Sequence, residues 1–358
     1  MISKHDLSLL HSAVRMAIRG HGSAEPNPLV GCIITGSTGT IVGSGYHRHF
    51  GKAHAEVNAL NQAGVHANGG TAYITLEPCN HHGQTPPCSQ ALLAAGINRV
   101  VIGVQDQHPT AGGGGAFLSE SGIKVDVAND SACQDLIAPF AHRVQTGLPW
   151  IICKWAQTPE GCIETPTGDS PWISSMRSQS LVHRERGRVD AIVVGVGTVV
   201  ADNPRLTVRG ARKRRTPLRV VIDPTLRTPP NANILDNDAP TLVAHARDAD
   251  QSRLSSCLKL TLPTQGDALD LAPLFRHLVT EFNATNVIVE GGATLFQHIF
   301  DQQLANELWI FTSPNRRDGL DTKYNINDLI KPLTLQCMDS RYRNGDHVTR
   351  FRVDLGFD

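Results

Sequence analysis

One histidine, two cysteines and one spare carboxylate stand out in the first third of this 358-residue chain: His54, Glu56, Cys79 and Cys88. A catalytic zinc ion takes three protein ligands and leaves its fourth position to water, whose pKa it lowers to about 7. Glu56 lies two residues beyond the histidine, so it is free to move protons instead of binding metal. The four residues therefore outline a hydrolytic zinc site.

Two other kinds of site use the same residue types. A buried free cysteine behaves as a small hydrophobic residue, and a structural zinc site closes the metal off from water with four ligands. His81 or His82 would supply that fourth ligand. The order of the motif, a His-x-Glu followed by two Pro-Cys elements, instead matches zinc enzymes that remove an amino group from a nucleobase. We therefore predict amino-group hydrolysis.

The elements predicted around these residues place them at the ends of regular structure. Residues 53–64 have helical spacing of apolar residues, so the histidine and the glutamate fall in a first helical turn. Residues 71–76 alternate and are rich in β-forming residues, and this strand leads into the first cysteine. Pro87 favours a helix start, with Cys88 in its first turn. The partial positive charge of helix N-termini favours the thiolate that a metal requires.

The chain length and the alternation of strands and helices predict two α/β domains. Gly147-Leu148-Pro149 breaks the chain, so residues 1–147 form the first expected domain and residues 148–358 the second. Strands are expected at residues 31–35, 71–76, 100–104 and 123–127, and in the second domain at 150–155, 191–194, 219–222, 241–244, 287–289 and 308–311. We also expect a helix over residues 133–146 and a flexible turn over the glycine-rich residues 111–116.

Two glycine pairs in the second half each follow a predicted strand: Gly195-Val196-Gly197-Thr198 and Glu290-Gly291-Gly292. Backbone amides at a helix start bind anions such as a pyrophosphate. A plain tight turn explains either pair alone, and together they leave a dinucleotide site and two turns as equal alternatives. The basic run over residues 212–215 is interpreted as a solvated loop.

Composition argues against several classes of function. The formal net charge is zero, which speaks against nucleic acid as a partner. No stretch reaches the roughly 20 apolar residues of a membrane span, and no signal-peptide core is present. The eight cysteines lack a secretory spacing, which indicates reduced thiols in the cytoplasm. We expect a small-molecule substrate and a homo-oligomer.

The segment from Cys79 to Cys88, CNHHGQTPPC, separates the cysteines further than in ordinary cytidine and adenosine deaminases. This insert, with PNPLVG at 26–31 and GSGYH at 43–47, closely resembles the deaminase domain of the bifunctional riboflavin-biosynthesis family RibD. The segments that resemble the reductase half of the same family are Lys154-Trp155-Ala156, GDSPWI at 168–173, the run through Asp202, and Glu290-Gly291-Gly292. The resemblance covers nearly the full chain and is thinnest over residues 225–280 and the C-terminal tail.

The resemblance implies a cytidine-deaminase-like three-layer domain followed by a dihydrofolate-reductase-like α/β domain. It implies zinc-dependent hydrolysis of the 2-amino group of 2,5-diamino-6-ribosylamino-4(3H)-pyrimidinone 5′-phosphate, and then reduction of the ribosyl group to ribityl with NADPH. On the deaminase side it assigns zinc to His54, Cys79 and Cys88, proton transfer to Glu56, and the pyrimidine to Asn27 and His47.

In the reductase half the implied residues fall into three groups. The NADPH contacts are Ala156, Trp172, Thr198, Asp202, Gly291, Gly292, Ala293, Thr294, Leu295, Phe296 and Gln297. The substrate contacts are Ser170, Arg186, Leu206, Arg209 and Glu290, with the arginines suited to its phosphate. Lys154 and Glu290 lie near the carbon that accepts hydride, the acid aiding proton transfer. An ordinary buried ion pair is the alternative for these last two.

Some segments depart from the family pattern. Thr158-Pro159-Glu160-Gly161 replaces a usual Ser-Leu-Asp-Gly turn, Asp106-Gln107-His108-Pro109 replaces Asp-Pro-Asn-Pro, and Asn306-Glu307 replaces Asp-Glu. The zinc motif is intact, so one alternative is a deaminase with a reductase-like domain of reduced or lost activity. The others are a non-catalytic, zinc-stabilised binding protein and a nucleic-acid deaminase, which the spare carboxylate and the neutral charge respectively disfavour.

Overall fold

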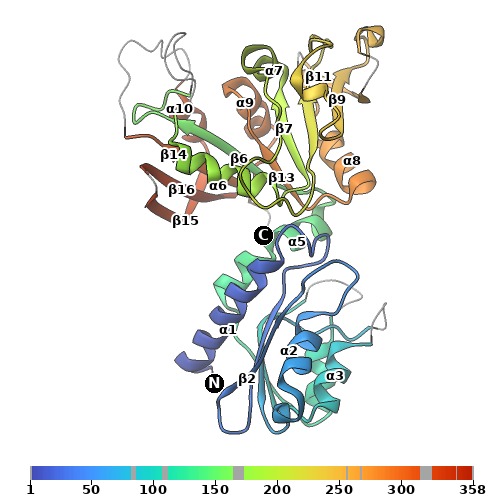
Figure 1. Ribbon diagram of the computed structural model, residues 1–358, viewed down its shortest axis with the longest axis vertical. Helices are drawn as coiled ribbons and strands as arrows, with labels where there is room; N and C mark the ends of the chain where they lie inside the picture. The colour runs from blue at the N-terminus through green and yellow to red at the C-terminus, as the bar shows by residue number, and fades with distance from the viewer. Residues whose placement is uncertain are drawn as a thin grey trace. The chain divides into compact units, whose positions relative to one another are not determined.

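The computed structural model describes residues 2–81, 86–106, 112–163, 173–254, 257–266, 268–314, 325–343 and 345–356. The chain divides into two compact units, residues 1–146 and 147–358, which are drawn in Figure 1. Within the described residues, none of the helices combines the length and the apolar character needed to cross a bilayer.

The first unit is built on a five-stranded sheet with the order β2-β1-β3-β4-β5. Its strands are β1 Gly31–Thr35, β2 Ile41–Tyr46, β3 Thr71–Leu76, β4 Arg99–Val104 and β5 Lys124–Val127. β1 is antiparallel to both β2 and β3, whereas β3, β4 and β5 are parallel. The carboxyl ends of these parallel strands therefore lie at one edge of the sheet.

Helices cover both faces of this sheet. They are α1 Lys4–Ala17, α2 Ala55–Ala63, α3 Cys88–Ala94, α4 Gly114–Glu120 and α5 Ser131–Thr146, with short 3₁₀ turns at Ile18–Gly20 and Gly64–Ala67. Alternate strand residues point to opposite faces, so Ile34 and Ile74 pack with α2, α3 and α4 while Ile33 and Tyr73 pack with α1. The result is the expected three-layer α/β domain.

Strand β2 was not among the expected strands, because its sequence, IVGSGY, is rich in glycine. The glycines serve close packing against α2. A Cβ atom on Gly43 would lie 2.3 Å from the Ala59 carbonyl oxygen, and one on Gly45 would lie 2.3 Å from that of Ala55. The two glycines therefore let α2, which carries Glu56, approach the sheet closely.

The glycine-rich segment also differs from its prediction. Instead of a flexible turn throughout residues 111–116, the structure begins α4 at Gly114, after Gly113 in a left-handed conformation (φ +90°); Ala111 lies outside the described residues. A Cβ atom on Gly114 would lie 1.9 Å from the Pro78 carbonyl oxygen. The glycine is therefore required by packing beside the first Pro-Cys element.

The second unit contains a nine-stranded sheet with the order β10-β9-β8-β7-β13-β6-β14-β16-β15. Its strands are β6 Trp150–Gln157, β7 Ala191–Gly195, β8 Leu218–Ile222, β9 Thr241–Ala246, β10 Leu258–Leu262, β13 Asn286–Val289, β14 Glu307–Thr312, β15 Thr334–Arg343 and β16 Asp346–Asp354. β11 Thr264–Gln265 and β12 Ala268–Leu269 form a separate hairpin. Neighbouring strands from β10 to β14 in this order are parallel, and β16 runs antiparallel to both of its neighbours, β14 and β15.

The helices of this unit are α6 Met176–Arg186, α7 Val196–Asp202, α8 Ala272–Phe282, α9 Ala293–Asp301 and α10 Ile326–Ile330, with 3₁₀ turns at Asn233–Leu235 and Gln251–Arg253. One core joins the sheet to α8 and α9 through residues such as Phe275 and Phe296. Every run expected as a strand here is one. Three further strands of the sheet, β10, β15 and β16, were not expected. Most residues of β15 are exposed, so it carries no apolar run.

Candidate functional site

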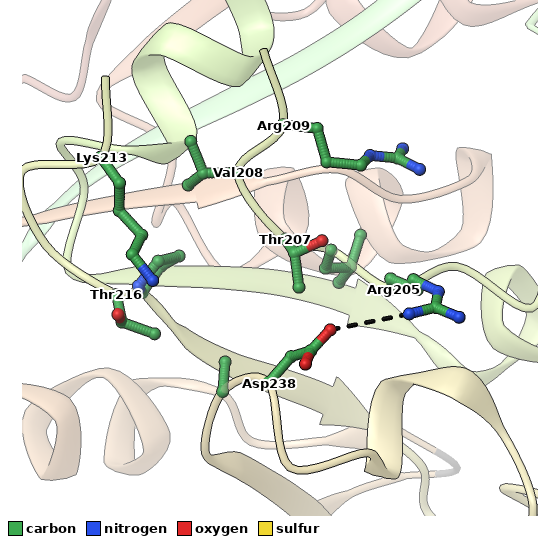
Figure 2. A pocket seen from close by; sticks show the side chains of 10 residues that line it. Arg205, Thr207, Val208, Arg209, Lys213, Thr216 and Asp238 are labelled. Atoms are coloured by element: carbon green, nitrogen blue, oxygen red, sulfur yellow. Dashed lines mark ion pairs between the residues drawn. The ribbon is translucent and has the colours of Figure 1, made fainter. Parts of the chain in front are cut away.

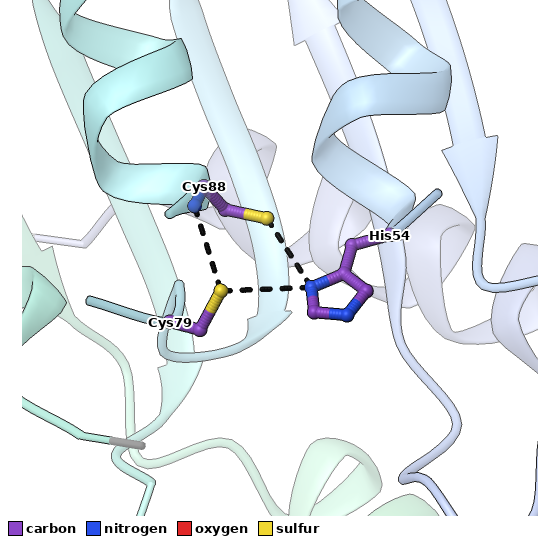
Figure 3. A group of neighbouring side chains, drawn as sticks. All are labelled: His54, Cys79 and Cys88. Carbon is purple, nitrogen blue, oxygen red and sulfur yellow. Dashed lines mark hydrogen bonds between the residues drawn. The ribbon is translucent and has the colours of Figure 1, made fainter. Parts of the chain in front are cut away.

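Three segments of the first unit bring the predicted zinc ligands together (Figure 3). His54 is the N-cap residue of α2, Cys79 follows the end of β3, and Cys88 is the first residue of α3. Two helix starts therefore face a strand end, as predicted from the sequence. The helix dipoles place partial positive charge beside the sulfur atoms.

The distances among the three side chains match what a tetrahedral zinc ion requires. His54 Nδ1 lies 3.5 Å from Cys79 Sγ and 3.4 Å from Cys88 Sγ. Zn–S bonds of about 2.3 Å and Zn–N bonds of about 2.0 Å at tetrahedral angles place sulfur and nitrogen about 3.5 Å apart. All three ligand atoms lie within 4.8 Å of one another. Among the described residues, this is the group that could hold a metal ion.

Charge within the cluster favours a thiolate. Hydrogen bonding from Cys88, supported by His54, lowers the pKa of Cys79 to about 4. The Cys88 amide at the start of α3 also donates to the Cys79 sulfur at 3.5 Å. Cys79 is therefore prepared as a zinc-binding thiolate, whereas the hydrogen bond with Cys79 and burial raise the pKa of Cys88, whose proton is released when a metal binds.

Glu56 lies in the first turn of α2 and is 3% exposed. Its Oε2 atom is buried and has no hydrogen-bond partner among the described residues. Burial raises the pKa of its carboxyl group above the ordinary glutamate value, which suits the group to taking up and releasing a proton. A buried carboxylate oxygen without a partner is costly in a purely structural role.

Asn27 and His47 lie next to this cluster. The amide nitrogen of Asn27 is 3.2 Å from His47 Nε2, while His47 Nδ1 is 3.2 Å from the Ala53 carbonyl oxygen. The His47 and His54 rings meet edge to face at 5.3 Å. Burial lowers the pKa of His47, so its ring is neutral and offers polar atoms to a neutral heterocycle.

Glu77 is a further residue of this site, to which the sequence analysis assigned no role. Its two carboxylate oxygens accept the backbone N–H groups of Gly115 at 2.8 Å and Asp106 at 3.1 Å. The carboxylate thereby ties the start of α4 and the segment that follows β4 to the segment that carries Cys79. A carboxylate directly before a Pro-Cys element was the available signal.

In the second unit, the sheet brings Lys154 and Glu290 together. β13 lies between β6 and β7, with Val289 opposite both Cys153 and Val193, so Glu290 emerges beside Lys154. The Lys154 Nζ atom lies 3.9 Å from Glu290 Oε2. Because neighbouring residues of β6 alternate between faces, Lys154 and Ala156 share one face while Trp155 enters the core.

Arg186 completes this group from the end of α6. Its Nε and Nη2 atoms donate to the two oxygens of Glu290 at 2.7 and 2.8 Å, a bidentate pair. Burial alone would raise the pKa of Glu290, but the charge of Arg186 outweighs it and lowers the pKa to about 2. Burial lowers the pKa of Lys154. The site therefore holds a permanent carboxylate between two cations.

The candidate cofactor residues lie at two helix starts on this unit. Thr198 and Asp202 belong to α7, which follows β7, and Gly292 is the N-cap residue of α9. The side chains of Leu295 and Phe296 are 5% and 0% exposed and pack in the core. Within the segment 291–297, a ligand would therefore meet backbone and the exposed Thr294.

Leu206 and Arg209 lie on the loop between α7 and β8, which lines a cavity of about 450 Å³ shown in Figure 2. Leu206 adopts a left-handed conformation (φ +50°) that a leucine rarely accepts. The buried Arg219 holds this loop by donating to the Arg205 carbonyl oxygen at 3.3 Å. Arg205 in turn lies 3.6 Å from Asp238 across the cavity.

Some predicted positions have no structural account. Ser170 and Trp172 lie outside the described residues, as do Gln107, His108 and Pro109. The turn at residues 158–161, whose sequence departs from the family pattern, is regular, since the Gly161 amide donates to the Thr158 carbonyl oxygen at 3.0 Å. Gly161 has φ +89°, a conformation that favours glycine.

Comparisons with known proteins identify a relative for each of the two domains. The family model "Cytidine and deoxycytidylate deaminase zinc-binding region" matches residues 3–104, and the model "RibD C-terminal domain" matches residues 149–317. Riboflavin biosynthesis protein RibD of Synechocystis sp. is 40% identical over 329 residues, which cover 90% of this chain and 88% of that protein.

Two solved structures share the fold along the whole chain. RibD of Acinetobacter baumannii has 30% identity and a TM-score of 0.80, covering 98% of this chain and 99% of its own. A diaminohydroxyphosphoribosylaminopyrimidine deaminase/5-amino-6-(5-phosphoribosylamino)uracil reductase of Thermotoga maritima has 29% identity and a TM-score of 0.82, with the same coverage. The chain therefore belongs to the RibD family of riboflavin biosynthesis, in which a zinc-binding deaminase domain precedes a reductase domain.

Proposed function

We propose that this chain catalyses two successive steps on one pyrimidine ribotide. The deaminase domain hydrolyses the 2-amino group of 2,5-diamino-6-ribosylamino-4(3H)-pyrimidinone 5′-phosphate to a carbonyl group and releases ammonia. The reductase domain then converts the ribosyl group to ribityl with NADPH. The observation that carries the first step is the His54, Cys79 and Cys88 cluster with a buried, unpartnered Glu56 oxygen beside it.

In the deaminase domain, His54, Cys79 and Cys88 are assigned as the zinc ligands. Zinc bound there supplies a Lewis acid that activates water for attack on the ring. Glu56 takes a proton from water and passes it to the leaving amino group, a role that its raised pKa supports. Asn27 and His47 hold the pyrimidine through the polar atoms described above.

In the reductase domain, the glycosylamine opens to an imine whose C1′ atom takes a hydride while its nitrogen takes a proton. NADPH supplies the hydride. Lys154 supplies the proton, because its ammonium group lies at the site and burial lowers its pKa. Glu290 was expected to aid proton transfer as an acid, but a carboxyl group with a pKa of about 2 stays ionised and serves to position Lys154 and Arg186.

The remaining reductase contacts follow the same layout. Arg209 binds the substrate phosphate, for which a guanidinium offers two parallel donors. Arg186 faces the substrate from the end of α6, where its guanidinium binds Glu290. Ala156 borders the nicotinamide from the face that Lys154 occupies. The segments that begin α7 and α9 receive the rest of the cofactor through backbone amides.

The test is an assay of the purified full-length chain with the diaminopyrimidinone phosphate, with and without NADPH, after zinc analysis. We expect ammonia release without NADPH, and NADPH-dependent loss of absorbance at the nicotinamide band once the deaminated product has formed. Ammonia release without any oxidation of NADPH would mean that the reductase domain is inactive. No ammonia release by zinc-loaded protein would overturn the proposal.

We also propose that the enzyme works as a homo-oligomer in the cytoplasm. None of the eight cysteines forms a disulfide in the structure, which is compatible with a reducing compartment. Light scattering of the purified chain at several concentrations measures its oligomeric state directly, and a concentration-independent monomer would contradict the assignment.

A further inference from the structure

Arg209, to which the substrate phosphate is assigned above, lies on a segment without regular structure. Residues 203–209 follow α7 and belong to neither a helix nor a strand. Figure 2 shows Arg205, Thr207 and Arg209 in succession along this segment. Leu206 has φ +50°, a strained conformation that persists only where the surroundings impose it. Because no helix or sheet ladder fixes this backbone, contacts from elsewhere in the domain must hold it.

Arg219 on β8 holds the first part of the segment. Alternate residues of β8 point to opposite faces of the sheet, so Val220 packs in the core with α8, while Arg219 is 0% exposed on the other face. Its Nη1 atom donates to the Arg205 carbonyl oxygen at 3.3 Å and to Asp236 Oδ1 at 2.7 Å. Its Nη2 atom donates to the Asp236 carbonyl oxygen at 2.6 Å and to that of Ala239. One guanidinium group therefore ties the segment to the loop before β9.

Stability alone is a poor explanation for an arginine at this position. A buried ion pair contributes little net stability compared with apolar residues of the same volume, because the charges lose their hydration. The Asp236 side chain is 30% exposed, so Arg219 is the partner that loses more. Its Nε atom is also buried without a hydrogen-bond partner among the described residues, which adds to the cost. The geometry that Arg219 imposes on the segment explains the residue better.

His183 on α6 holds the far end of the segment. Its Nδ1 atom accepts the amide N–H of Arg209 at 3.3 Å, which requires a neutral ring. Burial, and then the charges of Arg186 and Arg209, lower the pKa of His183, so the ring is neutral at pH 7. The Glu290 charge and a hydrogen bond with the Thr207 backbone act in the opposite direction but are outweighed. His183 lies one turn before Arg186 and so links the segment to the reductase group.

We propose that Arg219 and His183 are positioning residues of the reductase, which hold Arg209 where it binds the substrate phosphate. The inference rests on the proposed function, because it takes Arg209 as the phosphate ligand. Arg219 fixes the backbone at residue 205 and His183 fixes it at residue 209, on either side of the strained Leu206. Both act through the backbone of the segment, so loss of either should weaken substrate binding more than it slows hydride transfer.

The experiment measures NADPH oxidation on the deaminated ribotide, and ribotide binding by calorimetry, with the zinc-loaded, full-length chain. Arg219→Met keeps most of the volume but removes the donors. We expect it to raise the KM and the Kd for the ribotide by about tenfold, with kcat within about threefold of the parent value. The KM for NADPH should stay within about twofold, because the cofactor is assigned to the starts of α7 and α9, whereas an unfolded domain would change both KM values.

His183→Ala tests the second anchor at a partly exposed position, so it carries the test if Arg219→Met fails to fold. It should raise the KM for the ribotide in the same way. His183→Asn keeps an acceptor near the position of Nδ1 and should bring the KM back to within about threefold of the parent value. The matched controls, Arg276→Met and His277→Ala, lie on α8, which packs against the opposite face of the sheet. They should leave the KM unchanged.

A double-mutant cycle tests whether Arg219 acts through Arg209. In an Arg209→Gln background, Arg219→Met should raise the KM by less than about a further twofold, because the contact that it positions is already lost. An additive effect in this cycle would overturn the inference. So would an unchanged KM and Kd for the ribotide in both Arg219→Met and His183→Ala, or an equal rise in the KM for NADPH.

Failure of the proposed function gives a different result. A parent chain that binds the ribotide but oxidises no NADPH would refute the reductase step, and the Kd values of the variants would still decide whether the two residues position Arg209. A parent chain that does not bind the ribotide would refute both.

Discussion

The two candidate active sites of this chain are assembled in different ways. The zinc cluster joins His54 to Cys88 across 34 residues, at helix starts and a strand end that are neighbours in sequence. The reductase group joins Arg186 to Glu290 across 104 residues, and only the insertion of β13 between β6 and β7 brings Glu290 beside Lys154. Spacing encodes the first site, whereas sheet topology encodes the second.

The two sites also differ in the state of their carboxylates. Glu56 is buried with an unpartnered oxygen and a raised pKa, so it can take up and release a proton. Glu290 is clamped by Arg186 and has a pKa lowered to about 2, so it stays charged. Environment therefore gives the same residue type a proton-carrying role in one domain and a positioning role in the other.

Removal of a zinc ligand should have the largest effect, because it should abolish deamination and leave the reductase activity in place. Cys88→Ser replaces a thiolate with a hydroxyl group that binds zinc poorly, so we expect loss of the metal and at least about a 10⁴-fold loss of deamination. NADPH oxidation on the deaminated intermediate should persist, because the reductase group lies in the other unit. Metal analysis and both assays measure this. The control is Cys133→Ser, which changes another buried cysteine of the first unit and should keep its zinc. An unchanged zinc content in Cys88→Ser would contradict the ligand assignment.

Glu56→Gln should leave the metal in place and stop proton transfer. Loss of a general acid–base group costs about 10²–10⁴ in rate, so deamination should fall by that factor at full zinc occupancy. Ammonia release per bound zinc is the measurement. The exposed Glu120→Gln on α4 controls for the loss of a carboxylate. Deamination at the parent rate by zinc-loaded Glu56→Gln would exclude Glu56 as the proton carrier.

This contrast explains which features were predictable from the sequence. Ligand type, order and flanking helix signals are local, so the zinc cluster and its elements followed from residues 54–88 alone. The buried strands of the second sheet were visible as apolar runs. Their order in space was not, because it depends on the packing of distant segments. Lys154 and Glu290 were paired through family resemblance before any geometry joined them.

The features that were missed have physical causes of the same kind. The close approach of α2 requires glycines in β2, and the edge position of β15 leaves most of its residues exposed. Neither strand therefore carries a typical apolar pattern. The charge state of Glu290 depends on a contact with Arg186 that no local pattern contains.

Glu290→Gln should damage the reductase while sparing the deaminase. The substitution leaves Arg186 and Lys154 nearly buried without a counter-charge, and breaking such a pair costs about 3–5 kcal/mol of stability. Misplaced groups at the reacting carbon should lower NADPH oxidation by about 10²-fold. Arg186→Lys keeps the charge but loses the bidentate geometry, so its loss should be smaller. Equal NADPH oxidation by Glu290→Gln and the parent chain would show that the group is only a structural ion pair.

The pH dependence of the reductase should report on Lys154. The protonated amine is the active form, so kcat/KM falls as pH rises through a pKa that burial has lowered from its usual value. The Glu290 carboxylate opposes this lowering, so Glu290→Gln should move the alkaline limb to still lower pH. The deaminase profile, measured on the same protein, should not move. An alkaline limb near the ordinary lysine value of about 10.4, unchanged by Glu290→Gln, would mean that another group donates the proton.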